Sequence, residues 1–141
     1  MKKLVGMLTA FAVLFGLTAC GSKYDFTCTG TIEGQEGTIQ GIVKNGKVTE
    51  IHEETEMDAG SEESAKQYAA MYAGFGSMAS ESGMTMSAKA SGTKVKVTID
   101  VDVEKAKAAQ DSDDEDSDFD LSDTSKDAMI KYFEKQGLKC K

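Results

Sequence analysis

The chain has no arginine, proline or tryptophan, and the missing arginine narrows what it can bind. All 16 basic residues among its 141 are lysine, against 24 acidic residues, and the formal net charge is -8. Binding to nucleic acid needs a basic patch for the phosphates, and the acidic balance also opposes attraction to an anionic membrane surface. Without a guanidinium there is no bidentate clamp for phosphate. The composition therefore argues against nucleic-acid binding and phosphoryl transfer.

The first residues have the order of an export signal. Lys2 and Lys3 form a positive start, and an apolar run follows over residues 4–16. This run is shorter than the roughly 20 residues that a membrane-spanning helix needs. It predicts a signal peptide over residues 1–19. The sequence LTAC at its end, residues 17–20, resembles a bacterial lipobox.

The lipobox resemblance implies a lipid anchor on Cys20. In such lipoproteins the thiol takes up a diacylglycerol group and becomes the first residue after cleavage. Two or three palmitate-like chains hold a protein on a membrane stably, whereas one chain binds reversibly. Residues 20–23 would be the lipidated tether, and the expected location is the extracytoplasmic face of the cell membrane. The alternative is an ordinary secretory peptide cleaved after Ala19, which leaves Cys20 as a free thiol.

Two further cysteines remain, Cys28 and Cys140, near opposite ends of the exported chain. An even number of cysteines in an exported protein favours a disulfide. Closing so long a loop contributes about 4–5 kcal/mol if the effect is the lost entropy of the unfolded chain. The alternative is a reactive thiol or a metal pair, but no CxxC spacing supports it.

Residues 24–141 predict a single domain in which strands and helices alternate. The strand signals cover residues 24–31 and two hairpins, 37–57 and 84–103, with a turn region at 34–37. Strands followed by helices in this order predict an α+β fold. We expect an antiparallel sheet of about five strands with two helices packed on one face.

The first hairpin contains Asn45-Gly46, the strongest short signal for a two-residue type I′ turn. That turn pairs Val43 with Val48 and Ile42 with Thr49. Ile51 does not follow Val48 with a period of two, so the strand is expected to contain a bulge. The second hairpin is expected to turn near Ser91-Gly92.

Two helices are predicted, over residues 61–80 and 125–137, with Ser61 and Ser125 as N-caps and Gly137 as the stop. Apolar residues at helical spacing are expected to face the core. In the first helix these are Ala65, Tyr68, Tyr72, Phe75 and Met78, with Met71 at the edge, and in the second Ala128, Met129, Tyr132 and Phe133. The alternative for the first stripe is a groove that takes an apolar ligand or partner.

An acidic stretch separates the last predicted strand from the last helix, and we expect a flexible loop over residues 110–124. Its carboxylates suit Ca²⁺. An EF-hand loop starting at Asp111 would need glycine where Asp116 stands and glutamate where Ser122 stands. The pattern therefore predicts a solvated loop, with weak cation binding as the alternative.

His52 is the only histidine, and it stands between Glu50 and Glu54 with a strand's period of two. One histidine with carboxylates could hold Zn²⁺, but there is no second histidine. A hydrolytic triad would need a nucleophile beside His52, and no GxSxG motif is present. We expect a solvated acidic strand face here, with no catalytic residue, no metal and no cofactor.

The order of lipobox, strand, Asn-Gly hairpin, helix, the segment KVKVTIDVDVEKA (94–106) and a last helix containing YFEKQGLK (132–139) resembles the YehR-like family of small bacterial lipoproteins. The domain of that family has no assigned activity. The cysteine pair and the acidic loop depart from the YehR pattern and look more like a Firmicutes-type branch. The resemblance therefore supplies no catalytic residue.

The sequence predicts a bacterial cell-envelope lipoprotein that is not an enzyme and acts as a binding or interaction module. Its expected partners are the membrane, through Cys20, and a protein at the cell surface, but no nucleic acid. The first alternative is capture of a cation or small ligand at the groove between sheet and helix or at the acidic loop. The second alternative is a small envelope hydrolase.

Overall fold

A computed structural model covers the whole chain and describes residues 23–110 and 121–141. The predicted signal peptide, Cys20 and residues 111–120 of the predicted acidic loop lie outside the described residues. Within the described ranges no helix is both long enough and apolar enough to cross a membrane.

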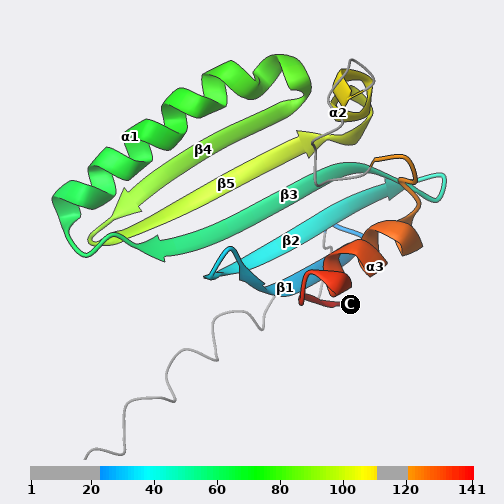
Figure 1. Cartoon of the computed structure of the whole chain (residues 1–141), viewed down its shortest axis with the longest axis horizontal. Coiled ribbons are helices and arrows are strands. Elements are labelled where there is room, and N and C mark those ends of the chain that lie inside the picture. The colour runs from blue at the N-terminus through cyan, green and yellow to red at the C-terminus, as the bar shows by residue number, and fades with distance from the viewer. Residues whose placement is uncertain (1–22, 111–120) are drawn as a thin grey trace, which may run out of the picture.

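The domain is built on one antiparallel sheet with strand order β4-β5-β3-β2-β1-β6 (Figure 1). This confirms the predicted α+β fold, with two small additions, the helix α2 and the two-residue strand β6. The strands are β1 Phe26–Ile32, β2 Gln35–Lys44, β3 Lys47–Asp58, β4 Met84–Ser91, β5 Lys94–Asp102 and β6 Lys139–Cys140. The helices are α1 Glu62–Ala79, α2 Val103–Gln110 and α3 Lys126–Lys135, with a 3-10 turn, η1, at Ser80–Ser82.

The hairpin between β2 and β3 turns as predicted. Asn45 and Gly46 both have positive φ, 53° and 77°, as a type I′ turn requires. Val43 pairs with Val48, but the pairing of Ile42 with Thr49 was wrong, since Ile42 faces Glu50 across a bulge.

That bulge has a consequence for the core. The extra residue lets Val48 and Ile51, three positions apart, both be buried. The turn between β1 and β2 is also tighter than predicted, because it uses only Glu33 and Gly34.

The two faces of the sheet differ in character. Cross-strand pairing puts Phe26, Gly41, Ile51, Val101 and Met84 in one row on the first face. Both long helices cover this face, α1 over β4 and β5 and α3 over the half that contains β1. Figure 1 shows α1 running along β4 and α3 lying at β1. The core accordingly forms two clusters, one beneath each helix.

Helix α1 begins as predicted, with the Ser61 hydroxyl accepting from the Ser64 amide. The expected core stripe was wrong in part. Ala65 is buried and Tyr72 packs against the core, but four large apolar side chains are exposed. They are Tyr68 40%, Met71 46%, Phe75 52% and Met78 79%.

The helix packs through its small residues instead. Gly76 is buried, and a Cβ added there would lie 2.0 Å from the Met86 carbonyl oxygen of β4. This close approach of helix to strand turns the larger residues outward.

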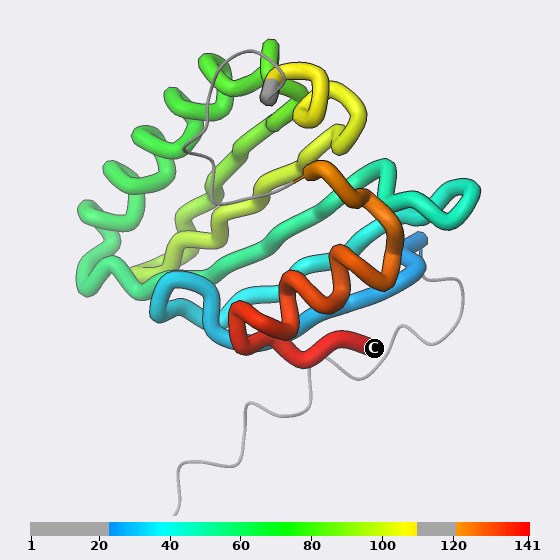
Figure 2. The backbone as a smooth tube through the Cα atoms, turned by 45° about the vertical axis from the view of Figure 1, so that its right-hand side comes forward, coloured from blue at the N-terminus to red at the C-terminus, as the bar shows by residue number. Residues whose placement is uncertain are grey.

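The C-terminal part closes the other half of the core. Helix α3 is capped by Ser125, whose hydroxyl accepts from the Ala128 amide, and it buries Met129 and Phe133. Gly137 follows with φ 91°, as a helix stop requires. The chain then returns beside β1 as β6 (Figure 2).

The predicted disulfide is present. Cys28 of β1 and Cys140 of β6 are directly opposed, with Cα atoms 3.9 Å apart, and their sulfurs are bonded. The bridge joins residues 112 positions apart. It therefore fixes the last strand of the sheet to the first.

Candidate functional site

The second face of the sheet carries polar side chains, and neither of the two long helices packs on it. We call it the open face. Its central row crosses five strands through directly paired residues: Thr27, Gln40, His52, Asp100 and Thr85. Within residues 23–110 and 121–141, this polar face is free of the long helices, and it is therefore available for contacts with another molecule.

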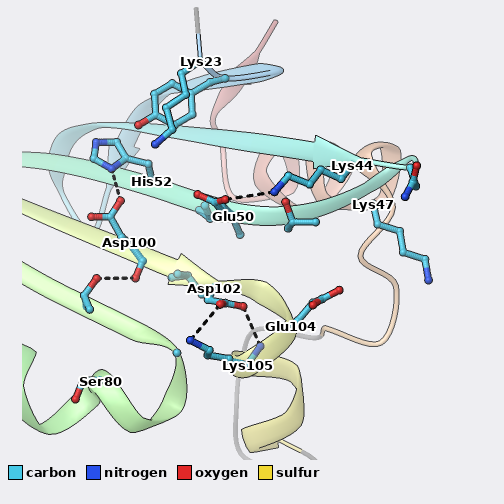
Figure 3. Close-up of a pocket in the computed structure, with 17 residues that line it drawn as sticks. Lys23, Lys44, Lys47, Glu50, His52, Ser80, Asp100, Asp102, Glu104 and Lys105 are labelled. Atoms are coloured by element: carbon cyan, nitrogen blue, oxygen red, sulfur yellow. Dashed lines mark hydrogen bonds and ion pairs between the residues drawn. The ribbon is translucent and has the colours of Figure 1, made fainter.

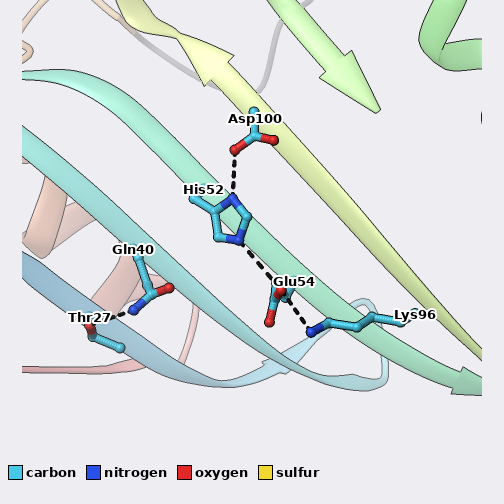
Figure 4. Close-up of polar contacts among 6 residues, drawn as sticks. All are labelled: Thr27, Gln40, His52, Glu54, Lys96 and Asp100. Atoms are coloured by element: carbon cyan, nitrogen blue, oxygen red, sulfur yellow. Dashed lines mark hydrogen bonds and ion pairs between the residues drawn. The ribbon is translucent and has the colours of Figure 1, made fainter. Parts of the chain in front are cut away.

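His52 lies at the middle of that row (Figure 4). Its Nδ1 is 2.6 Å from Asp100 Oδ1, and its Nε2 is 3.5 Å from Glu54 Oε1. The same Glu54 oxygen is 2.8 Å from Lys96 Nζ. The Tyr24 ring stacks on the imidazole, with centroids 5.6 Å apart and planes 21° apart. Only 19% of the His52 side chain is exposed.

The sequence explains part of this cluster. Glu50, His52 and Glu54 share one face, as the period of two predicted, and each is paired with a residue of β5. Asp100 was missed as a partner of His52, because the register between β3 and β5 depends on a connection through α1 and β4. The sequence did give one signal, since polar residues at 96, 98, 100 and 102 alternate with apolar ones and predict that Asp100 lies on the solvated side of its strand. Tyr24 precedes β1 and gave no signal of its contact with His52.

The chemistry of this cluster differs from that of a hydrolytic triad. A triad needs one imidazole nitrogen to face a nucleophile and the other an acid. Here both nitrogens face carboxylates. Over residues 23–110 and 121–141 no group of three or more histidine, cysteine or acidic side chains is arranged to hold a metal ion.

A cavity of about 740 Å³ opens at one end of the open face (Figure 3). Its charged lining is mixed in sign: Lys23, Lys44, Lys47, Lys105, Glu50, His52, Asp100, Asp102 and Glu104. Two of the lysines have nearby carboxylates, Lys44 at 3.9 Å from Glu50 and Lys105 at 3.6 Å from Asp102. Phe75 is not among the lining residues. The cavity therefore differs from the apolar groove considered from the sequence.

Asp102 connects this cavity to the fold. Its Oδ1 accepts the Lys105 amide at 3.1 Å, which caps the start of α2. This hydrogen bond, with the nearby Lys105 ammonium, lowers the pKa of Asp102 below its usual value. The carboxylate thus stays charged at the cavity wall, where β5 changes directly into helix.

The first face of the sheet, on which α1 and α3 pack, holds one unusual charged group, the carboxyl of Glu53. Glu53 of β3 pairs with Ile39 on one side and with Ile99 on the other. Burial among these residues raises the pKa of Glu53, and the nearby Glu33 raises it further. The sequence gives no signal for this role, because Glu53 stands in a run of acidic residues.

The predicted site residues therefore have different outcomes. Cys28 and Cys140 form the disulfide. Cys20 lies outside the described residues. Residues 111–120, which contain most of the acidic stretch considered for Ca²⁺, also lie outside them.

No protein-family model, no curated protein and no solved structure matches this chain.

Proposed function

We propose that this protein is a lipid-anchored module of the bacterial cell envelope that binds a partner protein through the open face. The observation that carries the proposal is the polar row from Thr27 to Thr85, on which neither long helix packs in the described part of the chain, with His52 held at its centre. The two long helices, α1 and α3, pack on the other side of the sheet, so this face contributes little to the core. Its polar side chains suit a reversible, polar interface.

The anchor belongs to the same proposal. The signal segment and the lipobox-like LTAC are the support for lipidation at Cys20. Membership of the YehR-like family is proposed on the same sequence features. A non-catalytic role is supported by the two carboxylates at His52, which occupy the positions that a nucleophile and a substrate would need.

Labelling in cells with an alkyne analogue of palmitate tests the anchor. The wild-type protein should take up label and sediment with membranes, and the Cys20→Ser variant should do neither. Equal membrane association of the two proteins would contradict the proposed address.

Site-specific photo-crosslinking tests the open face. A photoreactive residue at Gln40 should give a discrete adduct in cells, and one at the exposed Lys66 of α1 should not, because Lys66 lies on a helix that packs on the other face. Adducts from both positions, or from neither, would contradict a partner on this face.

The cavity of about 740 Å³ favours a second candidate, capture of a small charged ligand. Its mixed lining would suit a zwitterion better than an apolar molecule. Native mass spectrometry of the exported protein without added metal tests this. A stoichiometric adduct that is lost in the Lys105→Ala variant would support capture, and a bare, oxidised monomer would contradict it.

A further inference from the structure

Helix α1 carries two stripes of apolar or small residues, and the fold uses only one of them. The first stripe, at positions 65, 69, 72 and 76, packs on β4 and β5. The second consists of Tyr68, Met71, Phe75 and Met78, each at least 40% exposed. We call these four residues the exposed stripe. None of the four belongs to either core cluster of the described chain, or to the partly buried residues packed on one.

The spacing of the exposed stripe is that of a contact between two helices. Its residues follow one another at intervals of three, four and three positions, which is the a/d pattern of a seam between packed helices. A helix with two such seams is expected to lie between two partners. The sheet is the first partner, and α3 is not the second, since it packs on the other core cluster.

The charge of the protein indicates which second partner fits. No charged side chain occurs from Gln67 to Ser80, although 28% of the chain is charged. At a net charge of -8, two copies of the protein repel each other over most of their surfaces and approach most easily where charge is absent. The segment that joins Gln110 to Leu121 matches this uncharged surface poorly, because most of its residues are acidic.

The spacing also matches a second copy. Intervals of three, four and three read the same in both directions, so the exposed stripe can face an identical stripe whether the two helices run parallel or antiparallel. A surface that fits itself is what a two-fold dimer requires. Pairing α1 with the same helix of a second copy therefore satisfies the seam with no further element.

The size of the stripe sets the strength of the contact. Side chains of this kind present about 200 Å² each, so their exposed fractions leave roughly 400 Å² of apolar surface in one copy. Patches of this size are the largest on a typical monomer and often have a function. Two of them bury roughly 800 Å², below the roughly 1,200 Å² at which stable interfaces begin, so the dimer should be reversible.

We propose that the protein forms a two-fold dimer in which the exposed stripe of α1 packs against the exposed stripe of a second copy. The open face takes no part in this contact, because α1 packs on the first face of the sheet. Each dimer then presents two open faces. This inference goes beyond the proposed function, and neither depends on the other.

Sedimentation equilibrium of the chain from residue 20 onward tests the dimer without the anchor. Cys20→Ser in every sample removes both the lipid and the unpaired thiol, since Cys28 and Cys140 are bonded to each other. The average mass should rise from that of a monomer toward that of a dimer as the protein concentration increases. A monomer at every concentration would overturn the proposal and would mean that the exposed stripe takes a different partner.

Two double variants of equal charge and spacing test the contact itself. Met71→Lys with Met78→Lys puts two ammonium groups in the exposed stripe and should raise the dissociation constant of the dimer by at least about tenfold. Ala70→Lys with Ser77→Lys adds the same charges at exposed positions about 100° further round the helix and should associate as the wild type does. A stripe variant that still dimerises, or a control that does not, would overturn the proposal.

Two further measurements keep these results unambiguous. Both variants should keep the wild-type thermal midpoint in dilute solution, because all four positions are exposed. Added salt should strengthen the wild-type dimer, since it screens the repulsion between two acidic copies, whereas an interface made of ion pairs would weaken. A dimer that dissociates as salt is added would overturn an apolar contact through the exposed stripe.

Discussion

His52 and Asp100 face each other across β3 and β5, with Nδ1 2.6 Å from Oδ1. A carboxylate can only accept hydrogen bonds, so the imidazole must donate from Nδ1. That leaves Nε2 toward Glu54, at 3.5 Å. The shorter of the two contacts therefore favours a neutral ring that carries its proton on Nδ1.

This relationship gives a prediction for NMR. In solution at a pH where the ring is neutral, ¹⁵N shifts should show His52 mainly as the Nδ1–H tautomer. The Asp100→Ala variant should shift the ring toward the Nε2–H tautomer, because its acceptor is gone. Thr98→Ala, two positions away on the same face of β5, should change nothing. A wild-type ring that is mainly Nε2–H would contradict the geometry.

The disulfide should carry a large share of the stability. Reduction, or Cys140→Ser, frees a two-residue strand held to β1 by few pairs and restores the entropy of a long loop. We expect a loss of about 2–5 kcal/mol in the free energy of unfolding. Urea unfolding followed by circular dichroism, with and without reductant, measures it. Cys20→Ser is the control and should not change stability. Equal stability of oxidised and reduced protein would refute the prediction.

Glu53 should make the protein less stable as pH rises. Its pKa is raised in the fold by burial and by Glu33, so the folded state binds this proton more tightly than the unfolded state. Stability linked to Glu53 is therefore present below the ordinary value of 4.5 and is lost as pH rises through the raised pKa. The Glu53→Gln variant should be more stable than wild type at neutral pH.

The advantage of Glu53→Gln should disappear below pH 4.5. Urea midpoints across the pH range measure the difference. Glu134→Gln, on the exposed surface of α3, is the matched control and should show no such pH-dependent gain. A Glu53→Gln variant that is less stable than wild type at neutral pH would contradict the assignment.

Substitution by alanine at two glycines of α1 should change the stability of the fold in opposite directions. At Gly76 the new methyl would meet the Met86 backbone, and we expect overpacking to lower the free energy of unfolding by about 1–3 kcal/mol. At Gly74 nothing lies within 4 Å of the new atom, so Gly74→Ala should gain about 0.5–1 kcal/mol from helix propensity. Thermal and urea unfolding compare the two variants. Similar effects at both positions would mean that α1 does not pack on β4 through Gly76.

Two phenylalanines should likewise separate core from surface. Phe133 is 4% exposed and Phe75 is 52% exposed. Phe133→Ala should lower the free energy of unfolding by about 3–5 kcal/mol. Phe75→Ala should lower it by less than about 1 kcal/mol, as surface substitutions do. Unfolding measurements on both variants decide this. A large loss of stability in Phe75→Ala would mean that Phe75 is part of the core, as its spacing predicted.

The α1 result shows where sequence patterns fail. Tyr68, Phe75 and Met78 have helical spacing with Ala65, and spacing alone predicts that they are buried. The pattern cannot show that Gly76 allows the helix to approach β4 so closely that small residues fill the contact. Which side of a helix is buried depends on the partner surface, and that surface is formed by distant strands.

The sequence by itself determined the local elements and the cysteine pairing. The Asn45-Gly46 turn, the serine caps, the Gly137 stop and the alternation of β5 depend on backbone preferences and short-range periodicity, which act within a few residues. The number of cysteines, together with the predicted export signal, was enough to predict the pairing of Cys28 with Cys140. Only the tertiary structure decided that His52 meets Asp100, that Tyr24 stacks on the imidazole, and that α1 and α3 pack on the same face of the sheet. These contacts depend on strand order and register, which are fixed by packing between segments far apart in the chain.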